Sequence, residues 1–371
     1  MRRTFVWRSP PKRMRLASLF LALLVCHSAS SQPIDDINEL FKWVLELGGE
    51  INAVVRHNKD GVRGLFAAKA FVENDVIAAI PAATILNTGS FNDSFAVPTL
   101  TVLRELKDRN SRFKPYVDMW PKPDGILNSC NMDLKYAPMW KSAYWEKSVR
   151  DWENHLKALL NGDLDADLEY TIKEMVGNDP VTLDDLKYAC AISSTRYVSS
   201  LRRRRLIMAP IFDMANHVRN CTSTLSAYDR GNYLYFMAGQ EIKAGDEICY
   251  SYGSLRDDYS VAHYGFLPAL EDPPLLSLVD MPGFDPDMPY SHEDAPSDDP
   301  FDGTPEELQA EMARLKGIYN VIKSTPDALP PKPKGEDYVY DLMKDLEERR
   351  LNSLAYEIQR IAGLLNVKAE L

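Results

Sequence analysis

The sequence predicts an α+β protein, with short strands on either side of a helical stretch and two further helices near its end. Three observations support this expectation. Short β patterns lie at 51–56, 65–70 and 76–80, where apolar and β-branched residues cluster between turn residues. Residues 91–200 are mostly helical in pattern and rich in aromatic residues. After residue 303, apolar residues recur at helical spacing.

Size and charge limit the function classes. A chain of 371 residues can bury a large core and form two or three lobes. The formal charge is −11, and residues 1–31 carry six Lys or Arg and no acid, so the remainder is near −17. Such an acidic body is a poor general binder of nucleic acid, because that affinity comes largely from neutralised phosphates. A basic protein or peptide suits it better.

Residues 1–31 have the order of a secretory signal peptide. A basic start precedes the apolar run from Leu16 to Cys26, and small residues follow at 28–31. The run is too short to span a bilayer comfortably, so no stable membrane span is expected after cleavage. A signal anchor and a basic arm with a buried helix stay open as alternatives. So do the destinations: the secretory route, a plastid reached through a two-part signal, or the cytoplasm.

The first elements follow this segment. Helical spacing at 37–47 predicts a helix, which Gly48 and Gly49 end. Strands follow, and the glycine-containing turn 61–67 joins the first two.

The helical stretch ends in two features of interest. Its last predicted helix covers 184–196 and finishes at Arg196. Four arginines follow at 202–205. We interpret this run as a solvated turn, while a dock for an acidic substrate and a protease-sensitive loop stay open as alternatives.

The C-terminal part is expected to be helical after an irregular linker. Residues 271–303 contain many Asp and Pro and no Lys or Arg, which is typical of an acidic linker. Thr304, Pro305 and Glu307 then form a helix start, with an N-cap, a proline in the first turn and a glutamate three residues after the cap. A second long helix is expected at 336–365.

The most informative stretch runs from Pro210 to Phe266. Its motifs, in order, are Asn216-His217, the strand-like run 232–238, Gly245-Asp246-Glu247-Ile248, Ser251-Tyr252-Gly253 and Tyr264-Gly265-Phe266. Tyr250 and Tyr252 share one face of a strand because side chains alternate. This set resembles the SET domain of protein methyltransferases, and within it the subgroup typified by the Rubisco large-subunit lysine methyltransferase.

The resemblance implies the fold and its divisions. A SET-domain β-clip core of small sheets would occupy 32–270, split by a helical insert at about 91–200. The acidic linker 271–303 and a helical, substrate-binding C-terminal lobe at 304–371 would follow. A crossed-over segment would bring Asn216-His217 beside Tyr252.

The resemblance also implies a site. Tyr252 would be the catalytic tyrosine. The residues that would bind S-adenosyl-L-methionine are Gly64, Leu65, Phe66, Arg196, Asn216, His217, Tyr252 and Phe266. The possible walls of a substrate channel are Tyr235, Tyr250 and Tyr264. The implied reaction is methyl transfer from S-adenosyl-L-methionine to a lysine of a non-histone protein by a monomeric enzyme, and it requires no metal.

Three alternatives remain. The same subgroup contains protein histidine methyltransferases. An inactive SET fold acting as a binding scaffold is favoured by three departures from the family pattern. Val218 stands where serine is usual, and Asp257 stands where asparagine is common. Some relatives carry an arginine near the position of Phe66 that contacts the cofactor carboxylate, and the nearby arginine here is Arg63. A zinc site is the local alternative, because Asp213, His217 and Cys221 would share one face if their segment were helical.

Overall fold

We describe a computed structural model of the chain. The structure describes residues 34–59, 61–90, 93–163, 171–200, 204–227, 232–253, 255–270, 273–274, 301–324, 329–332, 335 and 337–369. The predicted targeting segment 1–31 and most of the predicted linker 271–303 lie outside these residues. Within the described ranges, no helix combines the length and the apolar character needed to cross a membrane.

The N-terminal part forms one helix and five short strands. They are α1 (Ile34–Glu46), β1 (Glu50–Ile51), β2 (Ala53–His57), β3 (Arg63–Ala67), β4 (Val76–Pro81) and β5 (Leu86–Ser90). The predicted helix and the three predicted strands are confirmed, although β1 and β2 divide the first strand between two sheets.

The predicted helical insert is confirmed. It contains α2 (Ala96–Lys107), α3 (Lys114–Val117), η2 (Pro123–Gly125), η3 (Leu134–Trp140), α4 (Ala143–Asn161), α5 (Ile172–Val176) and α6 (Leu183–Arg196). Thr182 and Asp185 form a capping box at the start of α6, which fixes where this helix begins. Residues Val198–Ser200, at the end of the expected insert, form strand β6 instead.

The remaining strands come after the insert. They are β7 (Arg205–Met208), β8 (Asn216–His217), β9 (Thr224–Ala227), β10 (Tyr233–Met237) and β11 (Glu247–Tyr250), followed by helix α7 (Asp257–Tyr264). A short 3₁₀ turn, η4 (Phe212–Met214), lies between β7 and β8.

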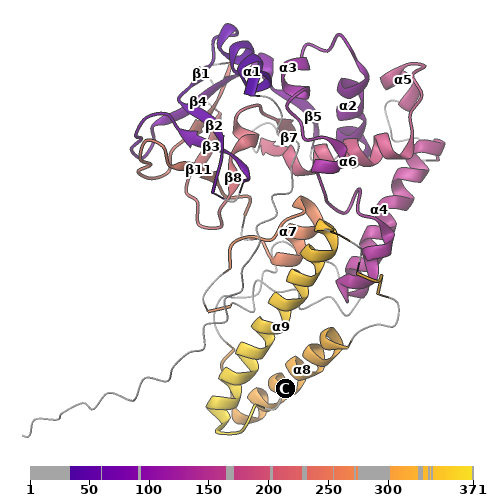
Figure 1. The fold of residues 1–371 in the computed structure, drawn as a ribbon, viewed down its shortest axis with the longest axis vertical. Coiled ribbons are helices and arrows are strands. Elements are labelled where there is room, and N and C mark those ends of the chain that lie inside the picture. The colour runs from indigo at the N-terminus through magenta and orange to yellow at the C-terminus, as the bar shows by residue number, and fades with distance from the viewer. Residues whose placement is uncertain are drawn as a thin grey trace, which may run out of the picture. The chain divides into compact units, whose positions relative to one another are not determined.

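Three small sheets combine strands from both sides of the insert. Their orders are β1-β4-β10-β9, β2-β3-β11-β8 and β5-β7-β6. Several of these strands are seen around α1 in Figure 1. Because β10 pairs with β4, and β11 pairs with β3, the insert interrupts one domain instead of separating two. The predicted α+β fold, split by a helical insert, is therefore confirmed.

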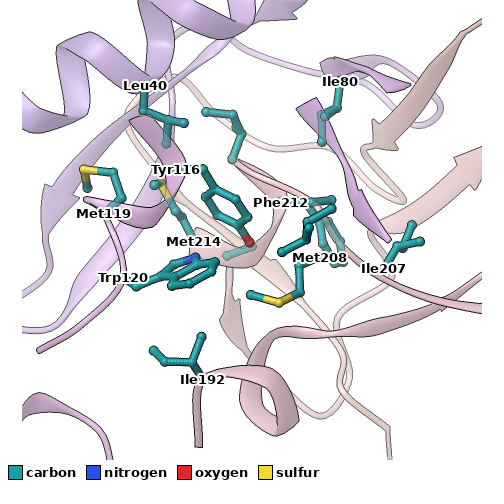
Figure 2. Packing of buried hydrophobic residues seen from close by; sticks show 14 of the residues in the cluster. Leu40, Ile80, Tyr116, Met119, Trp120, Ile192, Ile207, Met208, Phe212 and Met214 are labelled. Atoms are coloured by element: carbon teal, nitrogen blue, oxygen red, sulfur yellow. The ribbon is translucent and has the colours of Figure 1, made fainter. Parts of the chain in front are cut away.

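One apolar core joins the helical insert to the strands. Figure 2 shows Tyr116 and Trp120 of the insert close to Phe212 and Met214 of the η4 turn. All four side chains are at most 4% exposed. This packing fixes η4, and with it the start of the Asn216-His217 segment, against the insert.

The C-terminal lobe is a pair of helices, α8 (Pro305–Lys323) and α9 (Tyr338–Leu365). Thr304 and Glu307 form the predicted capping box. The two helices pack side by side through a cluster that includes Leu315 and Ile358 (Figure 1). The first half of α9 also packs on the insert, where Arg350 donates a hydrogen bond to the carbonyl of Trp140.

Two disulfides were not anticipated. Cys130–Cys190 ties the loop after η2 to α6, and Cys221–Cys249 ties the loop after β8 to β11. The paired Cα atoms are 5.9 and 6.0 Å apart, a usual separation for a disulfide. The cysteines of each pair are 60 and 28 residues apart, so their spacing gave no signal of pairing.

Candidate active site

Two strands within the Pro210–Phe266 stretch, β8 and β11, form a parallel pair. β8 lies beside β11, with Asn216 opposite Cys249 and His217 opposite Tyr250. Two residues beyond β11, the backbone N–H of Tyr252 donates to Nδ1 of His217 at 3.0 Å. The rings of His217 and Tyr252 are 5.1 Å apart. The expected crossing that brings Asn216-His217 beside Tyr252 is therefore present.

His217 is held as a neutral imidazole. Burial lowers its pKa to about 4, and Arg219 two residues later adds to that effect. Because Nδ1 accepts a hydrogen bond, the proton is assigned to Nε2. Among the described residues, this buried Nε2 has no hydrogen-bond partner. An N–H donor in that position suits a polar ligand atom.

Asn216 lies against the glycine-containing turn. Its Nδ2 donates to the carbonyl of Arg63 at 3.0 Å and to Oε1 of Glu247 at 2.7 Å. A Cβ on Gly64 would come within 2.4 Å of that glutamate oxygen and 2.9 Å of Asn216 Nδ2. A side chain at 64 would therefore displace the end of Glu247 or Asn216 and disturb this close approach. The next residue, Leu65, is fully buried in the core, between β2 and β11 in the sheet.

A cavity of about 570 Å³ lies beside Tyr250, Tyr252 and Tyr264. Its volume is within the range of small-ligand pockets. The residues that line it are Thr195, Arg196, Tyr197, Val198, Ser199, Ile207, Phe212, Asp213, Ala215, Leu225, Ser226, Leu234, Tyr250, Ser251, Tyr252 and Tyr264. Four predicted site residues, Arg196, Tyr250, Tyr252 and Tyr264, thus lie around one space.

Tyr252 connects this cavity to the Asn216-His217 strand. Its hydroxyl donates to the carbonyl of Ala215 at 3.0 Å, while its backbone bonds to His217. Burial raises its pKa to about 12. Burial also raises the pKa of Tyr264, whose ring is 4.9 Å from that of Tyr252. Both hydroxyls are therefore un-ionised at neutral pH.

The other predicted residues lie apart from the cavity. Gly64, Phe66, Asn216, His217 and Phe266 do not line it, although the Phe266 ring is 6.1 Å from that of His217. Tyr235 does not line it either. Its neighbour on β10, Leu234, does, and adjacent strand residues face opposite ways.

Arg196 is part of a buried network that sequence reasoning missed. Its Nη1 lies 2.8 Å from Asp213 Oδ2, and the hydroxyl of Tyr116 donates to the same oxygen at 2.7 Å. Nearby Arg63 donates to the carbonyl of Met119. Burial, followed by repulsion from Arg196, lowers the pKa of Arg63 to about 10. Only the position of Asp213, three residues before Asn216, could have suggested its part in the site.

An unusual turn positions Asp213. Ile211 has φ 69° and ψ −54°, and the N–H of Phe212 donates to the carbonyl of Pro210 at 2.8 Å. This is a γ-turn with positive φ, which is rare and strained, most of all for a β-branched residue. Ile211 is fully buried, so packing maintains the strained conformation.

The zinc alternative is wrong. The residues between Asp213 and Cys221 form a 3₁₀ turn, strand β8 and a loop, so Asp213, His217 and Cys221 do not share a helix face. Cys221 is bonded to Cys249 and has no thiolate to offer. In the part of the chain that the structure describes, no group of three acidic, His or Cys side chains is arranged to hold a metal ion.

Comparison with known families agrees with this geometry. The family model described as "SET domain" matches residues 62–253, just over half of the chain. The chain belongs to the SET domain family.

Among curated proteins, the chain is similar to the ribulose-1,5 bisphosphate carboxylase/oxygenase large subunit N-methyltransferase, chloroplastic, of Pisum sativum. The two are 24% identical over 301 residues, which is 72% of this chain and 56% of that protein. The [fructose-bisphosphate aldolase]-lysine N-methyltransferase, chloroplastic, of Arabidopsis thaliana is 22% identical over 272 residues, 65% of this chain and 54% of that protein. The chain thus spans about half the length of these relatives.

Solved structures match over more of the chain. A crystal structure of the SET domain of LSMT bound to lysine and AdoHcy gives a TM-score of 0.58 at 19% identity and covers 90% of this chain and 91% of that one. A structure of Rubisco LSMT bound to AdoMet gives 0.56 at 17% identity, with 89% and 91% covered. At these identities the likeness shows the fold.

Proposed function

We propose that this SET-domain protein is an S-adenosyl-L-methionine-dependent protein-lysine N-methyltransferase. One observation carries the proposal: Tyr252 lies on the wall of the aromatic cavity and also bonds to His217 on the strand that carries Asn216. The curated relatives support it, because both are named as N-methyltransferases and one as a lysine N-methyltransferase.

The residues around His217 fit the cofactor. The buried Nε2 of His217 offers a hydrogen-bond donor, and Gly64 leaves room where a Cβ would collide with Asn216. Phe266, near His217, offers a flat face suited to an adenine ring. S-adenosyl-L-methionine, when bound, supplies a methyl group on a positively charged sulfur. Asn216, His217, Gly64 and Phe266 would hold it.

The cavity fits the side chain of a lysine. Tyr250, Tyr252 and Tyr264 give it aromatic walls, and burial there lowers the pKa of an entering amine, so the neutral nucleophile forms more easily. Tyr252, with its pKa near 12, stays protonated and does not act as the base at neutral pH. Its bond to the Ala215 carbonyl fixes the hydroxyl as an oriented dipole at the reacting atoms.

Calorimetry with the full chain tests the cofactor site. The wild type should bind S-adenosyl-L-methionine, and Asn216→Ala should bind at least about tenfold more weakly, because Asn216 holds the strand against the turn at Gly64. Asn52→Ala is the control, since Asn52 bonds to Val76 outside the site. A folded wild type that does not bind the cofactor would favour the inactive scaffold.

Mass spectrometry of methylated proteins tests the reaction and its substrate. The wild-type chain, with labelled cofactor and a cell extract, should produce methyl-lysine on non-histone proteins. Methyl-histidine as the product would identify the alternative activity. Methylation confined to histone tails would contradict the non-histone substrate.

We also propose that residues 1–31 are a cleaved signal peptide. The two disulfides support this, since disulfides persist mainly in oxidising compartments. N-terminal sequencing after expression in eukaryotic cells should find a mature chain that begins near residue 32, and an intact Met1 would contradict cleavage. The relatives are named as chloroplastic, so a plastid import assay distinguishes the two-part signal from secretion.

The proposed organisation is a SET domain at 32–270, a linker at 271–303 and a substrate-binding lobe at 304–371. The proposed protein is a monomer, and its acidic body opposes binding to nucleic acid. Light scattering and a mobility-shift assay with duplex DNA test these two points.

A further inference from the structure

The β6–β7 hairpin forms part of the cavity wall. Val198, Ser199 and Ile207 of this hairpin line the cavity. Val198 lies opposite Ile207, and Arg205 precedes Ile207 by two residues on β7, toward the turn. Because residues two apart on a strand point the same way, Arg205 extends from the face that lines the cavity.

Arg205 is within reach of the cavity rim. It is two residues before Ile207, and strands rise about 3.3 Å per residue, so the two Cα atoms are separated by about 7 Å. Both Arg204 and Arg205 are exposed. Arg204 has φ 50°, which places it in the turn of the hairpin. The sequence continues backward from this turn with two more arginines, 202 and 203, outside the described residues.

The two described arginines have their charges available. Throughout the described ranges, neither forms an ion pair or a side-chain hydrogen bond. Asp93 follows strand β5, whose Ser90 lies opposite Arg205. Both oxygens of Asp93 already accept hydrogen bonds from Ser90. A local positive patch therefore lies beside the cavity of an otherwise acidic protein.

Local charge decides which substrate segment can approach. The Debye length is about 8 Å at physiological ionic strength, so distant acidic groups are screened at the rim while Arg204 and Arg205 are not. This local field opposes the overall charge, which by itself favours basic partners. Guanidinium groups bind carboxylates with paired hydrogen bonds, which makes them selective for Asp and Glu.

We propose that Arg204 and Arg205 bind carboxylates that flank the target lysine, so that the substrate is a lysine within an acidic segment of a protein. The inference rests on the proposed function, because it takes the cavity as the lysine site. A lysine side chain inserted there leaves the substrate backbone at the rim, where neighbouring carboxylates meet the two arginines. A nucleic acid could also meet arginines, but the acidic body opposes a long polyanion.

Paired peptides test this inference on the full chain with S-adenosylhomocysteine present. One fluorescent peptide carries a central lysine flanked by glutamates, and its twin has glutamines in their place. Anisotropy should give a Kd about tenfold lower for the acidic peptide, since each exposed ion pair contributes modestly. The double variant Arg204→Glu/Arg205→Glu should lose or reverse that preference, and added salt should reduce it in the wild type.

Matched changes make the result specific. Arg109→Glu/Arg150→Glu alters the net charge equally at two exposed arginines that do not line the cavity, and it should keep the preference. Equal binding of both peptides, binding of neither, or tighter binding of a single-stranded RNA than of the acidic peptide would overturn the inference.

Steady-state kinetics of methyl transfer to the two peptides test the acidic preference and the proposed methyltransferase activity separately. Preference for the acidic peptide should appear in KM, with kcat nearly unchanged in the double variant. Transfer at equal KM to both peptides would overturn the acidic preference and leave the methyltransferase intact. A preference in binding without transfer to any protein would overturn the methyltransferase and leave the acidic surface.

Discussion

Tyr252 joins the two parts of the site through separate atoms. Its backbone N–H bonds to His217 and its hydroxyl to Ala215. Tyr252→Phe removes only the hydroxyl, so we expect cofactor binding to persist while methyl transfer falls by about 100-fold, as for the loss of an oriented polar group at a reacting centre. Product mass spectrometry measures the rate. Tyr235→Phe, the same change outside the cavity, should keep full activity, and a fully active Tyr252→Phe would rule out the proposed role.

Gly64 tests the close packing beside Asn216. In Gly64→Ala, the new methyl group would meet Glu247 Oε1 and Asn216 Nδ2, so the end of one of these two side chains must shift and their mutual hydrogen bond is disturbed. We expect a loss of about 1–3 kcal/mol in the free energy of unfolding, as for other overpacked sites, and weaker cofactor binding. Denaturant titration and calorimetry measure the two effects. Gly317→Ala on α8 is the control, because nothing lies near its Cβ, and an unchanged Gly64→Ala would contradict the packing argument.

The neutral His217 predicts a pH dependence of stability. Its pKa in the folded protein is about 4, below the ordinary value of 6.5, so the unfolded chain takes up the proton first. The contribution of neutral His217 to the free energy of unfolding is therefore present above pH 6.5 and is lost as the pH falls from 6.5 toward 4. Urea titrations across this range should show a steeper loss for the wild type than for His217→Gln. Parallel losses would show that His217 titrates normally.

At the scale of elements, the Cys221–Cys249 disulfide holds the β8–β11 pair. Strand β8 has only two residues, so few backbone bonds fix it. The bridge closes a loop of 28 residues, which corresponds to roughly 3–4 kcal/mol of stabilisation in the chain-entropy account. We expect Cys221→Ser/Cys249→Ser to lower the Tm and weaken cofactor binding.

Cys130→Ser/Cys190→Ser is the matched comparison for that prediction. It removes a bridge within the insert, between the loop after η2 and α6, so it should lower the Tm with a smaller effect on cofactor binding. Scanning fluorimetry and calorimetry report the two quantities. If the two double variants weaken cofactor binding equally, the Cys221–Cys249 bridge acts only on global stability.

Elements with local signals were predictable from the sequence. The capping box at Thr304 and the strand at Tyr233–Met237 depend on neighbouring residues, and both are present. Contacts between distant segments were not predictable from local patterns. The bond from Tyr116 to Asp213 joins residues 97 positions apart. The position of Tyr235 outside the cavity depends on strand register, which residue type alone does not reveal.

At the scale of the whole molecule, the C-terminal helix is tied to the site. The hydroxyl of Tyr338, at the start of α9, donates to the carbonyl of Gly265 at 2.7 Å. Gly265 has φ 70°, and a Cβ there would lie 2.1 Å from the carbonyl oxygen of Leu127, so glycine is required. The motif residues Tyr264 and Phe266 on either side of Gly265 are thus fixed by α9 and by the insert together.

Asp257 makes a second link between α9 and the site. It is 6% exposed, and its two oxygens lie 2.7 Å from Arg219 Nη2 and 3.4 Å from Arg349 Nη1 of α9. Asp257, which stands where asparagine is common in the family, therefore has its negative charge balanced by two arginines. Arg219 follows His217 by two residues, and its carbonyl accepts a bond from Ser251 Oγ, next to Tyr252.

This arrangement predicts that Asp257→Asn weakens both the fold and the site. The substitution keeps the shape but removes the negative charge that faces the partly buried guanidinium groups of Arg219 and Arg349. The loss of a hydrogen bond to a charged group costs about 1.5–3 kcal/mol. We expect a lower Tm and slower methyl transfer, because the loop after His217 loses its anchor. Asp341→Asn, on an exposed position of α9, should change neither.

The variant Arg349→Met distinguishes the Asp257–Arg349 interaction from the Asp257–Arg219 interaction. Asp257 would keep Arg219, so the loop after His217 should stay in place and the Tm should fall less than in Asp257→Asn. If α9 also supports substrate binding, KM for a protein substrate should rise while cofactor affinity is unchanged. A fall in cofactor affinity equal to that of Asp257→Asn would instead show that α9 supports the cofactor site directly. The C-terminal lobe would then be part of the catalytic unit and not an attached binding region.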